Sequence, residues 1–411
     1  MNAVLPDRWL RLIPMTADRG LRLVRGDGAY VWDEDDRRYL DLDSDHGSSL
    51  LGYGQTSVVD AVERQLRRLT AAHHSFDHDA RDELVEALSV LAPEPLSHVV
   101  VVNTDVEAIE VALTAARIVT RRSRVVAMHG ASRGHPGEAH NDSKGSVAKH
   151  RVVRRDEDAV RVPYGDLDAL EAALDRRVAA VIVEPIQGDA GVVIPPDRYL
   201  AGVAERCSHH GVMLIIDETQ TALRTGSLLV STRQRVLPDI LCLSRGVANG
   251  LPIGVMVTRT EIAKRLQLRP GWHDSTDASN PLICAAATAT LRIATNPTLQ
   301  GHVNSVGDYF IARLKALRLA GIRHVRGSGL MIAVELRHAA APVLRSLAER
   351  GVLAIPGSNG VIMFFPPLIL ERRQVDVAVE ALAAAIRGGR RGGPEDDEVT
   401  LRGVATRRVK R

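Results

Sequence analysis

"GVMLIIDETQTALRTG", residues 211–226, sets an unbroken apolar run directly before the acidic pair Asp217 and Glu218. A run that is apolar at every position is typical of a strand that is covered on both faces. Such strands occur in parallel sheets flanked by helices, and binding sites lie at their carboxyl ends. The stretch therefore predicts an α/β fold with Asp217 at its site.

Four further runs of the same kind occur along the chain, separated by segments with helical periodicity. They are HVVVVN at 98–103, RVVAM at 124–128, AAVIVEP at 179–185 and DILCLS at 239–244. Because parallel strands end at the same edge of a sheet, we expect their last residues to lie near Asp217. These residues are Asn103, His129, Glu184 and Arg245.

The rest of the pattern predicts four parts in the chain. We expect an N-terminal segment with a small hairpin (1–45), a large domain (46–290), a compact α+β C-terminal domain (291–387) and a disordered tail (388–411). The tail is the one part whose composition is too polar and too rich in glycine and arginine to bury a core.

Composition excludes several classes of function. The chain has 411 residues, 45% of them hydrophobic, and a formal net charge of only +3, which indicates a soluble protein without a nucleic-acid surface. Cys207, Cys242 and Cys284 lie in apolar runs, so we expect buried reduced thiols and a cytoplasmic location. We find no run long enough to cross a membrane, and the histidines of 129–150 have no metal-binding spacing, so we expect neither membrane nor metal.

Several segments, in order, resemble the class III aminotransferases, and their ornithine-type members most closely. The segments are GDGAYVWDEDDRRYLDL, VEAIEVALTAAR, VEPIQGDAGVVIPP, GVMLIIDETQTALRTG, LPDILCLSRGVANGLPIG, HDSTDASNPLICAAATATL and VIMFFPPL. The resemblance covers about residues 20–387. It implies fold type I of the pyridoxal phosphate (PLP) enzymes, with a mainly parallel seven-stranded sheet and a small α+β domain. It also implies a homodimer that acts on a small molecule.

One departure from the family concerns the cofactor itself. In the resemblance, Arg245 of "LSRGVANGLPIG" (243–254) takes the position of the lysine that carries PLP. A Schiff base needs a primary amine, whereas a guanidinium stays protonated and delocalised. We therefore expect a chain that binds no PLP.

Other cofactor positions depart as well. The resemblance matches Thr104, Asp105 and Val106 to the residues that cradle the PLP phosphate, and Ser132 and Arg133 to the segment of the aromatic residue that stacks on its ring. The carboxylate of Asp105 would repel a phosphate. Thr104 is also expected to cap a helix that starts there, so that the end of the helix is filled from within.

The substrate positions change too. The resemblance places Met363 and Asp189 where ornithine-type members have an arginine and its glutamate partner, so a bidentate carboxylate clamp is lost. Three cofactor positions keep a polar residue. They are Asp217, which would pair with the pyridinium nitrogen, Gln220 beside it, and Thr276, which would reach the phosphate of the partner subunit.

An acidic residue at the end of a buried strand needs a cation when no pyridinium is present. We therefore predict that Arg245 lies within salt-bridge reach of Asp217, Asp105 or both. A structural ion pair filling the pocket is the alternative to a role in binding or catalysis.

Two sets of candidate residues follow. The catalytic candidates are Arg245, Asp217, Arg133, His46 and Asp45. The substrate-binding candidates are Asp189, Met363, Asp105 and Glu218. For Glu218 the alternative is a set of structural contacts, and for Asp45 and His46 it is a solvated loop.

Three functions remain open. The first is a repurposed enzyme that works without PLP, by acid/base or electrostatic catalysis on a small metabolite. The second is a non-catalytic homologue, a pseudoenzyme that binds a ligand or supports an active partner subunit. The third is an aminotransferase that uses PLP in an unusual way.

Overall fold

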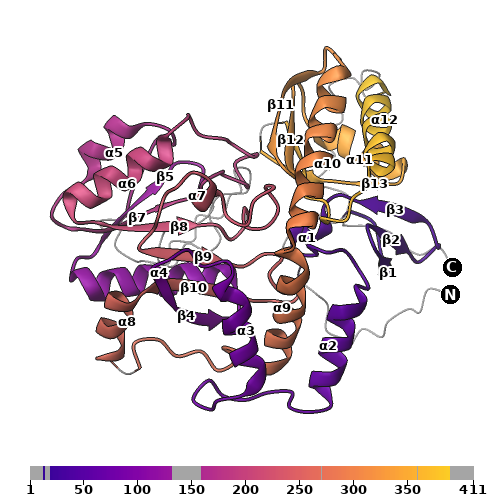
Figure 1. The fold of residues 1–411 in the computed structure, drawn as a ribbon. Helices are drawn as coiled ribbons and strands as arrows, with labels where there is room; N and C mark the ends of the chain where they lie inside the picture. Colours follow the sequence, from indigo (N-terminus) through magenta and orange to yellow (C-terminus); the bar gives the residue numbers. More distant parts are fainter. Residues whose placement is uncertain (1–12, 14–18, 132–158, 270, 359, 389–411) are drawn as a thin grey trace.

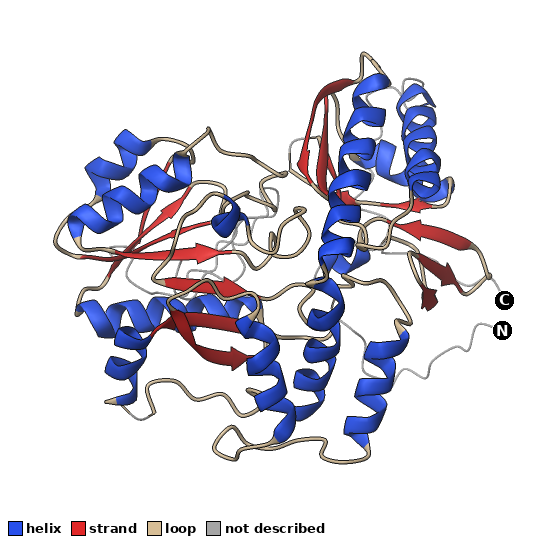
Figure 2. Cartoon of the chain, viewed as in Figure 1, coloured by secondary structure: helices blue, strands red, loops and turns tan. Residues whose placement is uncertain are grey.

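The computed structural model describes residues 13, 19–131, 159–269, 271–358 and 360–388 (Figure 1). Within these ranges the chain forms a larger body around a seven-stranded sheet and a smaller body with two four-stranded sheets. Helices cover both sides of the large sheet (Figure 2). The expected α/β class is confirmed.

The large sheet has the order β4-β10-β9-β8-β7-β5-β6. Its strands are β4 (Leu96–Val102), β5 (Arg124–Met128), β6 (Ala159–Val162), β7 (Val178–Val183), β8 (Met213–Asp217), β9 (Ile240–Leu243) and β10 (Gly254–Arg259). All neighbours pair in parallel except β10, which is antiparallel to both β4 and β9. The carboxyl ends of β4, β5, β7, β8 and β9 therefore meet at one edge.

The apolar run of β8 shows why this sheet is covered twice. Leu214 and Ile216 pack in the hydrophobic cluster of one face, and Ile215 packs in the cluster of the other face. The first cluster includes side chains of α6 (Tyr199–His210), and the second includes most of the buried side chains of α4 (Asp105–Thr120). The run from Leu214 to Asp217 is thus buried and Met213 is partly buried, as the unbroken hydrophobicity predicted.

The remaining helices of the larger body surround this sheet (Figure 1). They are α2 (Thr56–Leu66), α3 (Asp79–Ser89), α5 (Leu167–Ala173), α7 (Val230–Arg233), α8 (Thr260–Gln267) and α9 (Pro281–Ala294). Helix α9 packs against both α2 and α3. It begins where the side chain of Asn280 caps Leu282 N–H and proline occupies the first turn, a typical helix start.

The smaller body joins the two ends of the described chain. One sheet has the order β1 (Leu23–Asp27), β2 (Tyr30–Asp33), β3 (Arg38–Asp41) and β13 (Val352–Leu353), so a C-terminal strand pairs in parallel with the N-terminal hairpin. The other contains β11 (Ile322–Ser328), β12 (Met331–Leu336), β14 (Ile355–Pro356) and β15 (Val361–Phe364). Helices α10 (Pro297–Ala316), α11 (Ala341–Glu349) and α12 (Arg372–Gly388) accompany these sheets. The domain boundaries at 45/46 and 290/291 stay a prediction.

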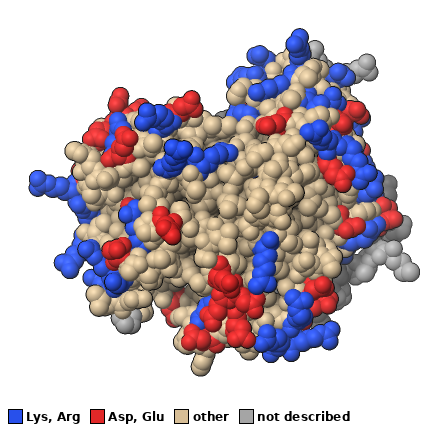
Figure 3. All heavy atoms as spheres, in the orientation of Figure 1, with Lys and Arg blue, Asp and Glu red and all other residues tan. Residues whose placement is uncertain are grey.

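On the face shown in Figure 3, basic and acidic side chains lie side by side mostly around the edge, and the middle is largely uncharged. Within the described ranges, no helix is both long enough and apolar enough to cross a membrane. Cys207, Cys242 and Cys284 are buried free cysteines, as expected from their apolar surroundings.

Candidate functional site

The candidate site lies at the carboxyl edge of the large sheet, where Asp217 ends β8. Asp217 is only 6% exposed. Its Oδ1 accepts hydrogen bonds from the backbone N–H of Thr219 at 2.9 Å and from the Thr219 hydroxyl at 2.6 Å. These two bonds fix the orientation of the carboxylate at the strand end that the sequence predicted.

Gln220 lies one turn beyond Asp217 and is also buried. In the described part of the chain, its Oε1 is buried without a hydrogen-bond partner. A Cβ placed on Gly188, in the loop after β7, would collide with this oxygen. The absence of a side chain at Gly188 thus allows close approach, and Gln220 keeps an acceptor for a donor from a ligand.

Arg245, just after β9, lies between two carboxylates. Its Nε is 3.3 Å from Oδ2 of Asp105, and its Nη1 is 4.0 Å from Oδ1 of Asp189. The side chains of Arg245 and Asp105 are 17% and 15% exposed, so this pair is largely shielded from water. The predicted ion pair with Asp105 is confirmed, and Asp189 joins it.

The start of α4 uses its own side chains. Thr104 caps the helix by accepting from Glu107 N–H at 3.1 Å, and Asp105 Oδ1 accepts from Val106 N–H at 2.8 Å. The predicted cap at Thr104 is confirmed. Two of the N–H groups that a helix start offers to an anion are therefore already bonded.

Glu107 connects α4 to the segment that carries Thr276. Its carboxylate is 3.2 Å from His273 Nε2 and 2.9 Å from Asn103 N. Burial raises the pKa of Glu107, but hydrogen bonds from Ser275, Asn103 and His273 outweigh it and lower this pKa overall. Thr276 itself is exposed, and its contact with a partner subunit stays a prediction.

Glu218 is completely buried. Its oxygens accept from Val230 N and Ser231 N at 2.9 and 2.8 Å, and from the hydroxyls of Thr221 and Ser231 at 2.8 and 2.6 Å. Burial raises the pKa of Glu218, against the lowering effect of these bonds. The contacts join the end of β8 to α7, a geometry that favours the structural alternative over a substrate contact.

The other substrate candidates have different surroundings. Met363 of β15 is 2% exposed and packs in an apolar cluster with Ile186, Val192 and Phe365. It can offer a ligand only apolar contact. Asp189 has a half-buried side chain beside Arg245.

Asp45 and His46 are exposed on a short strained turn, α1 (Ser44–Gly47). Ser44, Asp45 and His46 all have positive φ, at 50°, 54° and 50°. Each left-handed residue of this kind costs about 1–2 kcal/mol, so the turn depends on surrounding contacts. One such contact is the hydrogen bond from His46 N to Asp43 Oδ1 at 2.7 Å. A catalytic role for Asp45 and His46 stays a prediction.

Sequence reasoning missed Arg224. This side chain is 1% exposed, donates to Gly47 O in the α1 turn, and lies with its guanidinium carbon 5.6 Å from the centre of the Phe365 ring. Burial, and then the charge of Arg245, lower the pKa of Arg224 to about 9. Its only sequence signal was a single cation within "TQTALRTG".

Two predicted site residues, Ser132 and Arg133, lie outside the described residues. The structure therefore brings together Arg245, Asp105 and Asp189, and Asp217 ends the strand next to the one that Arg245 follows.

Known proteins resemble this chain over most of its length. Residues 15–386 match the family model "Aminotransferase class-III". Acetylornithine aminotransferase of Methanopyrus kandleri is 35% identical over 368 residues, which cover 89% of this chain and 94% of that protein. Ornithine aminotransferase 2 of Staphylococcus aureus is 34% identical over 370 residues, covering 88% and 92%.

A solved structure agrees with these relatives. The ornithine aminotransferase of Toxoplasma gondii, crystallised in the presence of oxidized glutathione, superposes with a TM-score of 0.81 at 29% identity and covers 91% of each chain. That structure has partial occupancy of PLP at its active site.

These relatives contradict three expectations that depended on Arg245: an enzyme that does not use PLP, a pseudoenzyme, and a chain without a cofactor. The similarity extends over about nine-tenths of the chain and points to conventional PLP-dependent aminotransferases. The physical reason for the error is that a cofactor is held by many contacts, so the side chain at one position does not decide whether it binds. The non-covalent contacts of a cofactor, such as a carboxylate for its ring nitrogen, do not need an amine.

Proposed function

Because this chain belongs to the class III aminotransferases, we propose that it is a PLP-dependent aminotransferase of an unusual kind, which holds its cofactor through non-covalent contacts. Its substrate is a small molecule with a primary amino group. The relatives named for ornithine and acetylornithine support this substrate class. That Arg245 replaces the Schiff-base lysine follows from the resemblance and stays part of the proposal.

The residues present fit PLP best at its ring nitrogen. A protonated pyridine nitrogen would be a further partner for the buried carboxylate of Asp217, beside the hydrogen bonds from Thr219. The buried, unpartnered Oε1 of Gln220 offers a second acceptor nearby. When bound, PLP supplies the carbonyl group that exchanges an amino group and the ring that stabilises a carbanion.

The side chains of this site have separate roles in binding the cofactor and the substrate. Asp217, oriented by Thr219, keeps a proton on the ring nitrogen of the cofactor. The guanidinium of Arg245 balances Asp105 and so reduces the repulsion that this carboxylate would exert on a phosphate at the start of α4. Met363 lies in a buried apolar cluster and offers no charged group to a substrate carboxylate, which favours substrates recognised through their amine.

The observation that carries the proposal is the buried, oriented carboxylate of Asp217. We expect saturable PLP binding to the purified protein, measured by equilibrium dialysis. Asp217→Asn removes the charge while keeping the shape, so the dissociation constant should rise by about tenfold or more, as for the loss of a charge-assisted hydrogen bond. Asp197→Asn, at an exposed aspartate before α6, is the matched control and should bind as the wild type does.

No saturable binding to the wild type would contradict the cofactor assignment. Equal binding by the wild type and Asp217→Asn would contradict the assigned role of Asp217.

We also propose a homodimer in which Thr276 faces the partner subunit's cofactor phosphate. The family resemblance supports this arrangement, and the bonds of His273 and Ser275 to Glu107 hold the neighbouring segment against α4. Light scattering on the purified chain measures the oligomeric state.

A further inference from the structure

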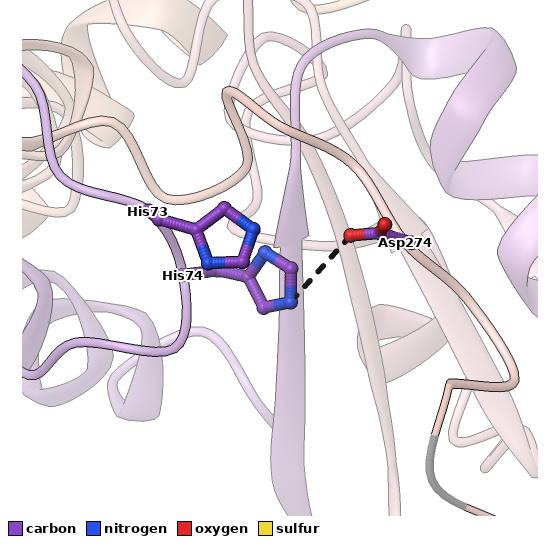
Figure 4. A group of neighbouring side chains, drawn as sticks. All are labelled: His73, His74 and Asp274. Carbon is purple, nitrogen blue, oxygen red and sulfur yellow. Dashed lines mark ion pairs between the residues drawn. The ribbon is translucent and has the colours of Figure 1, made fainter.

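A group of metal-binding side chains lies away from the carboxyl edge of the sheet. His73 and His74 follow α2, and Asp274 lies between α8 and α9, 200 residues later in the chain (Figure 4). One ligand atom from each residue comes within 4.8 Å of the others. Among the described residues, this is the only group of three or more His, Cys, Asp or Glu side chains whose ligand atoms converge in this way.

The distances suit one small cation. His74 Nε2 lies 3.9 Å from Oδ1 of Asp274. In tetrahedral coordination two ligands of one zinc ion, each about 2.0–2.2 Å from it, are about 3.3–3.6 Å apart, so this pair has to close by about 0.5 Å. His73 has to close by at most about 1.5 Å, which rotation of exposed side chains allows.

The surroundings orient the two histidines differently. Nδ1 of His73 accepts from Ser75 N–H at 3.3 Å and lies 2.8 Å from the Ser75 hydroxyl. Binding a metal through Nε2 requires the tautomer with its proton on Nδ1, which keeps the contact with the hydroxyl and gives up the one with the backbone. The rings of His73 and His74 have centroids 4.2 Å apart, so both side chains face the same region. In the described structure, Nδ1 of His74 is buried and has no hydrogen-bond partner.

The two segments are already held together without an ion. His78 Nε2 lies 2.9 Å from the carbonyl oxygen of Ser279, and Arg81 donates to the carbonyl oxygen of His74 at 3.0 Å. Because His78 Nδ1 accepts from Arg81 N–H, its Nε2 carries the proton and donates to Ser279. An ion would therefore bind between two segments that are already in contact in the folded chain, so its binding would lose little conformational entropy.

We propose that His73, His74 and Asp274 form a binding site for a divalent transition metal, zinc above all, with water completing its coordination. Two imidazoles and one carboxylate are a ligand set that zinc uses with an open position, and they are too nitrogen-rich to favour calcium or magnesium. The ion ties the segment after α2 to the segment that carries His273 and Thr276. This site is additional to the aminotransferase activity and independent of PLP.

Zinc titration of the tag-free, full-length protein against a chromophoric chelator tests the proposal. We expect one zinc per chain, and a dissociation constant at least tenfold higher in Asp274→Asn and in the double variant His73→Asn/His74→Asn. The matched control is His209→Asn/His210→Asn, which removes the adjacent histidine pair at the end of α6. There, Nε2 of His210 is already bonded to Glu171 at 2.7 Å, and zinc binding should not change.

Asp274→Asn keeps the proposal testable if the double variant misfolds, because the Asp274 side chain is 78% exposed. Cobalt titration gives a second readout, since ligation by these residues produces visible absorption that Asp274→Asn should weaken. PLP binding, measured in parallel, should be the same in all variants. Absence of stoichiometric zinc in the wild type, or equal zinc affinity in the wild type and Asp274→Asn, would overturn the site.

Discussion

Arg245 is held by Asp105 and Asp189 at the edge of the sheet where parallel strands end. Its position after β9 follows from the apolar run 239–244, so its neighbourhood could be predicted from strand ends alone. The expectation that the chain binds no PLP was wrong, because the identity of one side chain does not determine whether a whole site binds its cofactor. Asp217, at the carboxyl end of the neighbouring strand β8, is the better indicator.

Restoring an amine at this position gives a prediction at the scale of one residue. Arg245→Lys should form a covalent adduct with PLP, because a lysine amine can attack the aldehyde. The adduct should give a visible absorption band that survives gel filtration, and borohydride should convert it to a stable secondary amine, seen as an increase in protein mass. The control is Arg233→Lys, at an exposed arginine on α7, which should give no such band.

A lack of adduct in a folded Arg245→Lys protein would mean that residue 245 does not face the cofactor carbonyl. That outcome would remove the assignment of this position, while leaving the role of Asp217 open to its own test.

Other residues of the site could not be predicted from local pattern. The burial of Arg224 and the close approach of Gly188 to Gln220 both depend on segments far apart in the chain. No periodicity or cap marks such contacts, since they arise only when the loop after β7, the end of β8 and the α1 turn pack together. The strand-end rule identified Asp217 because it depends on one element alone.

At the scale of elements, unbroken apolar runs predicted β4, β5, β7, β8 and β9 to within about two residues at each end. Strand β10 and its antiparallel direction were missed. A short apolar run does not encode the direction in which the chain passes through a sheet, because both directions bury the same side chains.

The α1 turn gives a prediction for a single element. Gly47 has φ +85°, and a Cβ there would lie 2.5 Å from Nη2 of the buried Arg224. Gly47→Ala should therefore lower the free energy of unfolding by about 2–4 kcal/mol, from backbone strain plus displacement of a buried cation.

Gly211→Ala is the matched control for this substitution. Gly211 also has positive φ, at +59°, but nothing lies within 4 Å of its Cβ position. It should lose only the conformational part, about 1–2 kcal/mol. Chemical denaturation measures both variants, and equal losses would show that Arg224 does not restrain the turn.

At the scale of the molecule, the two ends of the described chain are joined through β3 and β13, a pairing between residues more than 300 positions apart. Sequence pattern placed the N-terminal hairpin and the C-terminal strands separately and could not join them, because a two-residue strand carries almost no pattern of its own. The prediction of buried thiols, made from the apolar runs around the three cysteines, is confirmed.

These thiols test the integrity of the whole core. Burial raises the pKa of Cys207 and Cys284 to about 12 and that of Cys242 well above its usual value. Since the thiolate is the reactive form, the native protein should react slowly with a disulfide reagent at pH 8 and show little gain in rate toward pH 9. The denatured chain should release three equivalents at once, and fast reaction of the native protein would contradict the packing described.

The most direct test of the proposed function is amino-group transfer by the intact protein. The protein is incubated with PLP and ornithine, and pyridoxamine phosphate is followed by mass spectrometry against PLP and ornithine alone. Pyridoxamine phosphate should form faster with the wild type and with Asp197→Asn than without protein. With Asp217→Asn it should form at a rate close to the protein-free one. Equal rates with and without the wild-type protein, under conditions where it binds PLP, would contradict an aminotransferase that acts on this substrate class.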